Sequence, residues 1–269
     1  MNTLLSIGHG YCGAATGAAL GPGWRVLGTS RRPGAAVLWP DQAAQALAEA
    51  THLISWVAPG EGDPVVPLLA SLPAPRLSWI GYASATSLYG DAGGDWIDEN
   101  AADQPSTARG LARQRAEQAW QAFADARGLP LALLRIAGIY GPGRSALDAL
   151  RQGRAHRVVK AGQVFNRIHV ADLGRIAAAA AERRIAGPVI LCDLEPAPMA
   201  DVTTFAAGLL GIEPPPQVDF DSADLSPMAR SFYEENKRLR SIRIGPDLGV
   251  TLDYPDYRRG LAAIHAAGG

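Results

Sequence analysis

The residues best suited to chemistry lie near the start of the chain, where three glycines follow an apolar run. Gly8, Gly10 and Gly13 are spaced as Gly-x-Gly-x-x-Gly, directly after residues 3–8 and at the start of a helical pattern over residues 11–20. Glycines at this spacing permit a tight turn and let a pyrophosphate approach the backbone at a helix N-terminus. A plain glycine turn is the alternative. The position between a strand and a helix favours a dinucleotide site.

A second signal follows the next apolar run, residues 24–29. Arg31 and Arg32 stand where an acidic residue usually binds the ribose 2′-hydroxyl of NAD, and no Asp or Glu competes there. An arginine at this point suits the 2′-phosphate of NADP instead, although two solvated loop arginines are the alternative. We therefore expect NADP as the cofactor. The other residues expected to contact it are Gly8, Gly10, Tyr11, Cys12, Gly13, Ala58, Pro59 and Arg113.

The elements that must position these residues follow an alternating pattern. Strands are expected over residues 3–8, 24–29, 37–39, 52–57, 77–82 and 131–136, and helices over 11–20, 41–50, 64–72 and 107–127. Asp41 is expected to cap the helix over 41–50. Such alternation predicts an α/β fold of the Rossmann type, with a doubly wound parallel sheet covered by helices on both faces. We assign residues 1–140 and 170–192 to this domain, and 141–169 and 193–269 to a smaller substrate lobe.

Composition excludes several other classes of function. The 269 residues carry a formal net charge of −1 with both signs mixed, which does not indicate a surface for nucleic acid. Two cysteines make no disulfide framework, and no His/Cys/Asp group has metal-ligand spacing. The apolar runs are too short to span a membrane, and the start lacks a signal-peptide pattern. We expect a cytoplasmic protein with a small-molecule substrate or no partner, and a homodimer is one option.

Three longer stretches resemble a known family. They are residues 82–120, residues 134–144 (LRIAGIYGPGR) and residues 165–179 (FNRIHVADLGRIAAA). They are similar to the extended short-chain dehydrogenase/reductases, the group of nucleotide-sugar epimerases and dehydratases. The resemblance implies a Rossmann domain with a small C-terminal substrate lobe, and it places Arg144, Asn166, Arg167 and His169 near a substrate.

The chain departs from this family at the catalytic residues. When Glu117 is aligned with the family's helix Glu, Arg109 and Arg113 stand where the family has the Tyr and Lys of Tyr-x-x-x-Lys. Ala85 occupies the position of the catalytic hydroxyl, and Ile7 that of the first glycine. Arg113 could keep the contact to the nicotinamide ribose. Arg109 cannot replace the phenol, because a guanidinium does not give up its proton in proteins. The chain is therefore similar to atypical members, which retain the cofactor site.

Other groups could replace the missing tyrosine. Ser84, Thr86, Tyr89 and Tyr140 are candidates for a displaced acid/base, with packing as the alternative for the tyrosines. The spacing of Arg109 and Arg113 places both on one helix face, where they could grip an anionic substrate or form a solvated basic face. Asp63 is either a site residue or a helix cap.

Two functions remain open at this stage. One is an NADP-dependent, epimerase/dehydratase-like oxidoreductase with a degenerate site, acting on a small anionic metabolite. The other is a non-catalytic NADP-binding sensor or interaction protein.

Overall fold

The central element of the protein is one parallel sheet. The computed structural model describes residues 1–32 and 36–268, so the last residue of the predicted substrate lobe, 269, lies outside it. Among the described residues, seven parallel strands are ordered β3-β2-β1-β4-β5-β7-β11. Their bounds are β1 Asn2–Ile7, β2 Trp24–Ser30, β3 Val37–Leu38, β4 His52–Ser55, β5 Trp79–Ala85, β7 Leu131–Ile136 and β11 Gly187–Leu191. The strand order reverses between β1 and β4, and ligands of such sheets bind at the carboxyl ends of the strands flanking that point.

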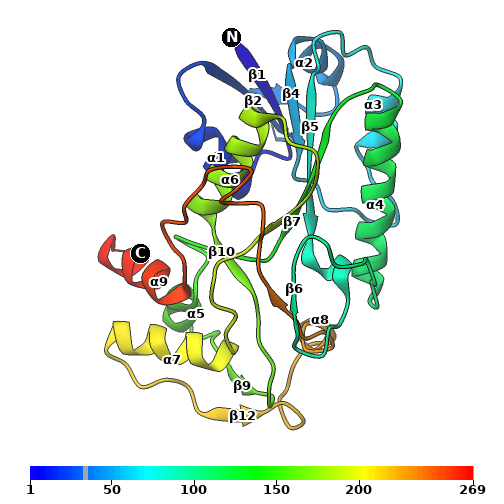
Figure 1. The fold of residues 1–269 in the computed structure, drawn as a ribbon. Coiled ribbons are helices and arrows are strands. Elements are labelled where there is room, and N and C mark those ends of the chain that lie inside the picture. Colours follow the sequence, from blue (N-terminus) through cyan, green and yellow to red (C-terminus); the bar gives the residue numbers. More distant parts are fainter. Residues whose placement is uncertain (33–35, 269) are drawn as a thin grey trace.

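Helices cover both faces of this sheet (Figure 1). One face carries α2 (Ala43–Glu49), α3 (Val66–Ala70) and α4 (Ala108–Asp125); the other carries α1 (Tyr11–Ala19) and α6 (Val170–Arg183). Each face has its own buried apolar core, with Trp120 of α4 in the first and Ile176 of α6 in the second. A Cβ added at Gly174 would lie 2.6 Å from the carbonyl of Ala15, so α6 and α1 pack backbone against backbone. The predicted doubly wound α/β fold is confirmed.

The remaining elements lie mostly in the lower half of Figure 1, where α5, α7, α8, β9 and β12 are labelled. They are η1 Thr86–Tyr89, β6 Trp96–Ile97, β8 Gly138–Tyr140, α5 Ala146–Arg151, β9 Arg157–Val159, β10 Arg167–His169, α7 Met199–Leu210, β12 Gln217–Asp219, α8 Pro227–Ser231, β13 Arg238–Leu239 and α9 Tyr257–Ala266. The helices α5, α7 and α9 share a buried core around Leu147, Val202 and Leu261. Glu99 ties this part to the sheet, because its carboxylate accepts from Ile190 N at 3.0 Å and from Ile242 N at 2.9 Å.

Several predicted boundaries are wrong by a few residues. Asp41 does not cap α2: backbone bonds from Gln42 N to Leu38 O and from Ala43 N to Pro40 O continue the turn after β3, so the helix begins later. Strand β4 ends at Ser55 rather than at residue 57. Strand β5 runs to Ala85 rather than to Tyr82, because its last three small residues pair with β7. Helix α3 is shorter than predicted at both ends.

Candidate functional site

The turn between β1 and α1 is tied to the end of β2. Gly8 has φ +72°, a backbone conformation that favours glycine, and a Cβ added there would lie 2.9 Å from Cγ2 of Val57. Its N–H donates to Oγ1 of Thr29 at 3.0 Å, and His9 N donates to the Thr29 carbonyl at 3.1 Å. These bonds hold the glycine turn beside the carboxyl end of β2, where Arg31 and Arg32 follow.

Helix α1 begins at this turn without a side-chain cap. Gly10 is its N-cap residue, and a Cβ there would meet no protein atom closer than the Gly8 carbonyl oxygen at 3.8 Å. A Cβ at Gly13 would instead lie 2.8 Å from Oγ of Ser6, so this glycine lets α1 pack closely on β1. The first N–H groups of a helix have no partners within the helix and carry its positive dipole end. These N–H groups are what an anion would bind at this turn.

Two predicted cofactor contacts occupy the first turn of α1. The hydroxyl of Tyr11 donates to the Pro142 carbonyl at 3.1 Å, which links the helix to the turn after β8. Burial raises the pKa of the Cys12 thiol, which keeps it protonated in spite of the nearby helix N-terminus. Cys12 packs against the core under α6, as a small apolar residue would.

A pocket of about 530 Å³ lies next to the turn, lined by His9, Ala14, Gly17, Val26, Gly28, Thr29, Ser30 and Ala36. Arg31 and Arg32 come directly after its Ser30 and are both exposed. The Arg32 N–H donates to Oγ of Ser30 at 3.0 Å, so the backbone turns at this point. Ala58 and Pro59 lie just beyond the carboxyl end of β4. All the predicted cofactor residues thus belong to the carboxyl-end loops of β1, β2 and β4 or to α1, except Arg113.

Arg109 and Arg113 point from α4 to different partners. One guanidinium nitrogen of Arg113 donates to the Tyr82 hydroxyl at 3.1 Å and to the Ala83 carbonyl at 2.8 Å. The Arg109 guanidinium stacks on Phe232, with 4.2 Å between its Cζ and the ring centroid. Arg113 therefore carries its charge to the carboxyl end of β5, whereas Arg109 faces the segment after α8.

Three of the four predicted hydroxyl candidates lie where β5 ends. Ser84 is the last but one residue of β5, Thr86 begins η1, and Tyr89 ends it. The hydroxyls of Ser84 and Tyr89 are buried and have no hydrogen-bond partner among the described residues. Burial raises the pKa of Tyr89 to about 12, and burial also raises the pKa of Tyr82 to about 12. Neither phenol is therefore poised to lose its proton near neutral pH.

A buried ion pair beside these hydroxyls escaped the sequence analysis. Arg135 of β7 lies in register with Ser84, and its guanidinium is 4.8 Å from the Tyr89 ring centroid. It binds Glu117 of α4 through two hydrogen bonds of 3.2 and 2.8 Å, and Asp103 at 2.7 Å. The available signal was a single charge within an otherwise apolar strand, LALLRI. The pair anchors α4 on the sheet, because it joins Glu117 of α4 to Arg135 of β7 inside the protein.

The residues of the NRIH stretch are engaged in internal bonds. Asn166 donates to the Lys237 carbonyl at 2.9 Å and accepts from Leu239 N at 2.8 Å. Arg167 donates to the carbonyls of Phe165 and Ala197. His169 caps α6 by accepting from Ala171 N at 3.2 Å.

Tyr140 and Arg144 lie next to this stretch. Tyr140 pairs with His169 in the β8–β10 ladder and donates to the Asp256 carbonyl at 3.3 Å. Burial raises the pKa of its phenol. Arg144 is exposed in the turn after β8. The substrate role of Arg144, Asn166, Arg167 and His169 stays a prediction, and so does the acid/base role of Tyr140.

Asp63 has a clear structural task. One carboxylate oxygen accepts from Val65 N at 2.8 Å and Val66 N at 2.9 Å, and the other accepts from the Trp120 indole at 2.8 Å. Both oxygens are therefore used to start α3 and to fix α4, which favours the capping interpretation.

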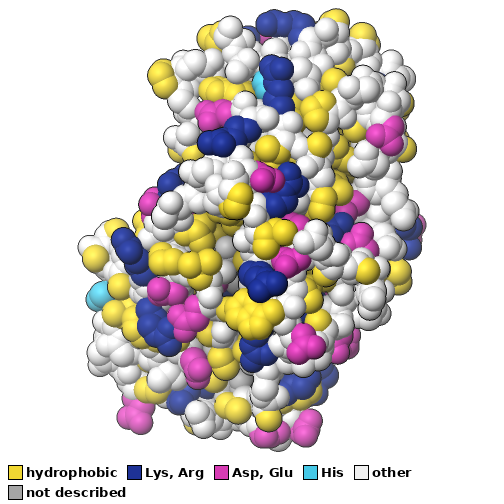
Figure 2. Space-filling view, viewed as in Figure 1, with side chains coloured by type: hydrophobic (Ala, Val, Ile, Leu, Met, Phe, Trp, Pro, Cys, Tyr) yellow, Lys and Arg dark blue, Asp and Glu magenta, His cyan; other side chains and the backbone are white. Residues whose placement is uncertain are grey.

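The described residues contain neither a metal-binding group nor a membrane-spanning helix. Within residues 1–32 and 36–268, no three His, Cys, Asp or Glu side chains are grouped so that they could hold a metal ion. No helix in the same ranges combines the length and apolar character needed to cross a bilayer. On the face shown in Figure 2, basic and acidic side chains are interspersed.

The chain is similar to several proteins of known structure. No family model matches the sequence, and no curated protein matches it. A functionally unknown conserved protein from Silicibacter pomeroyi is 46% identical, with all of this chain and 99% of that one covered and a TM-score of 0.90. A protein from Methylobacillus flagellatus, assigned as an NAD-dependent epimerase/dehydratase, is 25% identical over 99% and 98% of the two chains, with a TM-score of 0.74. A human epimerase family protein with NADPH shares the fold at 20% identity, with 99% of each chain covered and a TM-score of 0.79.

Proposed function

The chain belongs to the extended short-chain dehydrogenase/reductase superfamily, and from this premise we propose that it binds NADP and acts as an epimerase/dehydratase-like oxidoreductase on a small anionic metabolite. The observation that carries the proposal is the pair of exposed arginines directly after β2. They stand beside the glycine turn, in a segment that contains no acidic residue between β2 and Asp41. A ribose 2′-phosphate placed there meets two cations, whereas NAD would lack its usual acidic partner.

The residues of the turn fit a dinucleotide. The uncapped N-terminus of α1 would hold the pyrophosphate, with Gly10 offering backbone and no side chain on that side. Arg113 would contact the nicotinamide ribose from the carboxyl end of β5, where its bonds to Tyr82 and Ala83 already hold it. When bound, the cofactor supplies or accepts two reducing equivalents. The human neighbour with NADPH supports the cofactor class.

The chemistry around the nicotinamide has to proceed without the family's tyrosine. Arg109 and Arg113 keep their protons, so they can bind an anion and polarise a carbonyl but cannot exchange a proton with substrate. The proton must then come from Ser84, Thr86, Tyr89, Tyr140 or water. Ser84 suits this role best, because its hydroxyl is unpaired and its neighbour Ala83 is bonded to Arg113.

A non-catalytic NADP-binding protein is the second candidate. It is favoured by the engagement of both arginines within the protein: Arg109 lies on Phe232, and Arg113 is bonded to Tyr82 and Ala83. A sensor of this kind would bind NADP with the same preference but would turn over no substrate.

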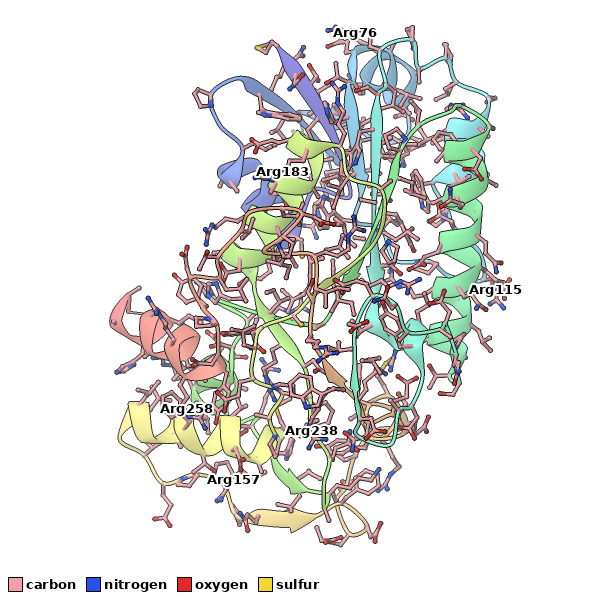
Figure 3. All side chains as sticks on the ribbon, viewed as in Figure 1. Arg76, Arg115, Arg157, Arg183, Arg238 and Arg258 are labelled. Carbon is pink, nitrogen blue, oxygen red and sulfur yellow. The ribbon has the colours of Figure 1, made fainter. Side chains whose placement is uncertain are left out.

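Titration with NADP⁺ and NAD⁺ by calorimetry tests the cofactor. We expect NADP⁺ to bind at least about tenfold more tightly, about 1.4 kcal/mol, through charge-assisted contacts to the 2′-phosphate. The double variant Arg31→Ala/Arg32→Ala should lose this preference and keep its NAD⁺ affinity. Arg76→Ala is the matched control, because this exposed arginine precedes β5 and lies at the opposite end of the sheet (Figure 3). Equal affinities in the unmodified protein, or an unchanged preference in the double variant, would contradict the proposal.

A further inference from the structure

The imidazole of His9, between the first two glycines of the turn, lies in a slot walled by glycines. A Cβ added at Gly28 would lie 2.7 Å from Cγ of His9, one at Gly13 would lie 2.9 Å from Nδ1, and one at Gly17 would lie 3.8 Å from Cε1. The ring therefore packs on the backbones of α1 and β2, and larger residues at Gly13 or Gly28 would displace it. His9 is held in one place although it belongs to a loop.

A chain of hydrogen bonds sets the tautomer of this ring. The indole N–H of Trp56 donates to Oγ of Ser6 at 3.1 Å, and the same oxygen lies 3.0 Å from Nδ1 of His9. The indole uses one lone pair of the buried Ser6 oxygen, and among the described residues Nδ1 is the only acceptor for the hydroxyl proton, so in the neutral ring Ser6 donates to Nδ1. The ring proton then lies on Nε2, for which the described residues offer no hydrogen-bond partner. Ser6 and Trp56 thus favour an N–H donor at Nε2 in the neutral ring.

His9 belongs to the pocket beside the two arginines. His9 lines the pocket together with Gly28, Thr29 and Ser30, and Arg31 follows directly. The elements packed against the ring, β1, α1 and β2, contain no Asp or Glu.

The ionisable groups around the ring favour binding of an anion. The elements packed against the ring carry Tyr11 and Cys12 on α1 and Arg25 at the far end of β2. Arg31 and Arg32 follow directly after β2. Burial lowers the pKa of His9, and no carboxylate on these elements compensates. A bound anion would compensate, because its negative charge favours the protonated ring.

We propose that His9 is a third contact for the 2′-phosphate of NADP, donating from Nε2, and that its protonated form binds this phosphate more tightly than its neutral form. The inference rests on the proposed cofactor and adds a residue and a pH dependence to it. A phosphate beside the ring favours the imidazolium, so proton binding and phosphate binding reinforce each other. The part of the preference for NADP over NAD that His9 contributes therefore rises as the pH falls from 8 to 6.

Calorimetric titration of NADP⁺ and NAD⁺ at pH 6, 7 and 8 tests this with His9→Gln, which retains a donor but cannot be protonated. At pH 6 we expect the variant to bind NADP⁺ about tenfold more weakly, the effect of one lost charge-assisted hydrogen bond, and less so at pH 8. Its NAD⁺ affinity should stay within about twofold, since NAD lacks the phosphate. The 2′-phosphate also titrates near pH 6, but it does so equally with both proteins. His265→Gln, on an exposed face of α9, is the control for loss of a histidine.

If His9→Gln lowers the affinity for NADP⁺ and for NAD⁺ equally, the proposal is overturned, because His9 would then only shape the turn. The proposal is also overturned if the ratio of NADP⁺ to NAD⁺ affinity is the same in His9→Gln and in the unmodified protein at every pH. If the unmodified protein itself does not prefer NADP⁺, the proposed cofactor fails instead.

Because the variant could disturb the slot, NMR titration of the His9 ring in the unmodified protein gives a second measurement. Adenosine 2′,5′-bisphosphate should raise the His9 pKa, and adenosine 5′-monophosphate should leave it unchanged. The same shift with both ligands would refute the 2′-phosphate contact.

Discussion

Replacing Gly10 by alanine tests whether the turn after β1 faces a ligand rather than the protein. A Cβ at Gly10 would lie no closer to any protein atom than 3.8 Å, from the Gly8 carbonyl oxygen, which is an ordinary contact. At Gly8 an added Cβ would lie 2.9 Å from Val57, and at Gly13 it would lie 2.8 Å from Ser6. Gly10 is therefore the glycine of this motif at which the fold itself tolerates a methyl group.

The two effects of this change differ in sign. A Gly-to-Ala change that the native backbone accepts raises the free energy of unfolding by about 0.4–1 kcal/mol, through the lower entropy of the unfolded chain. A methyl group forced into a closely packed contact costs about 1–3 kcal/mol. If that contact is the pyrophosphate, the affinity for NADP⁺ falls about 5- to 150-fold, since each 1.4 kcal/mol is about tenfold. Gly10→Val should abolish binding while circular dichroism shows a folded protein.

Urea unfolding and calorimetric titration with NADP⁺ measure the two effects on the same samples. The control is Gly208→Ala on α7, where an added Cβ meets no atom within 4 Å and cofactor affinity should not change. Normal NADP⁺ binding by Gly10→Ala and Gly10→Val would show that the dinucleotide lies elsewhere. A large loss of stability in Gly10→Ala would show that the glycine serves the fold.

Two further predictions concern pH and turnover. His52 is buried and accepts from Nε of Arg184 at 3.3 Å; burial, and then the charge of Arg184, lowers its pKa to about 4, below the unfolded value of about 6.5. The contribution of neutral His52 to the free energy of unfolding is fully present above pH 6.5 and is lost as the pH falls toward 4, about 3 kcal/mol in all. Urea unfolding from pH 7 to 4 should therefore show a free energy of unfolding that depends less on pH in His52→Gln than in the unmodified protein. The same pH dependence in both proteins would contradict this. Oxidation of NADPH with neutral ketones should be very slow in the unmodified protein and should rise in Arg109→Tyr/Arg113→Lys, since acid–base assistance is worth about 10²- to 10⁴-fold. Arg115→Lys, an exposed neighbour on α4 (Figure 3), is the control, and rapid turnover of a neutral ketone by the unmodified protein would refute the assigned roles.

The elements that carry the predicted cofactor residues could be placed from sequence because they follow local rules. A strand, a glycine turn and a helix follow one another within residues 2–19, and the second strand ends at Ser30, just before Arg31. Each element is marked by its own apolar run or glycine. The spatial order of the strands then brings the ends of β1, β2 and β4 together, as parallel topology requires.

The other half depends on contacts between distant segments, which local patterns do not encode. The end of β5 was predicted too early because Ala83, Ser84 and Ala85 have weak strand propensity; pairing with β7 makes them a strand. The bond network of Asn166 likewise depends on Lys237 and Leu239, some seventy residues further along the chain. The slot of His9 needs Gly28 of β2 opposite Gly13 of α1, a juxtaposition that neither residue reveals alone.

The two arginines of α4 differ in what they can still offer a substrate. Arg113 already uses one nitrogen for Tyr82 and for Ala83, so its position is fixed and its remaining N–H groups are directed by these bonds. Arg109 uses only the flat face of its guanidinium, stacked on Phe232, and has no hydrogen-bond partner among the described residues. Stacking leaves the N–H edge of a guanidinium available for bidentate binding of a carboxylate or phosphate. Under the proposed function we therefore expect Arg109 to bind the charge of an anionic substrate, and Arg113 to position the cofactor beside it.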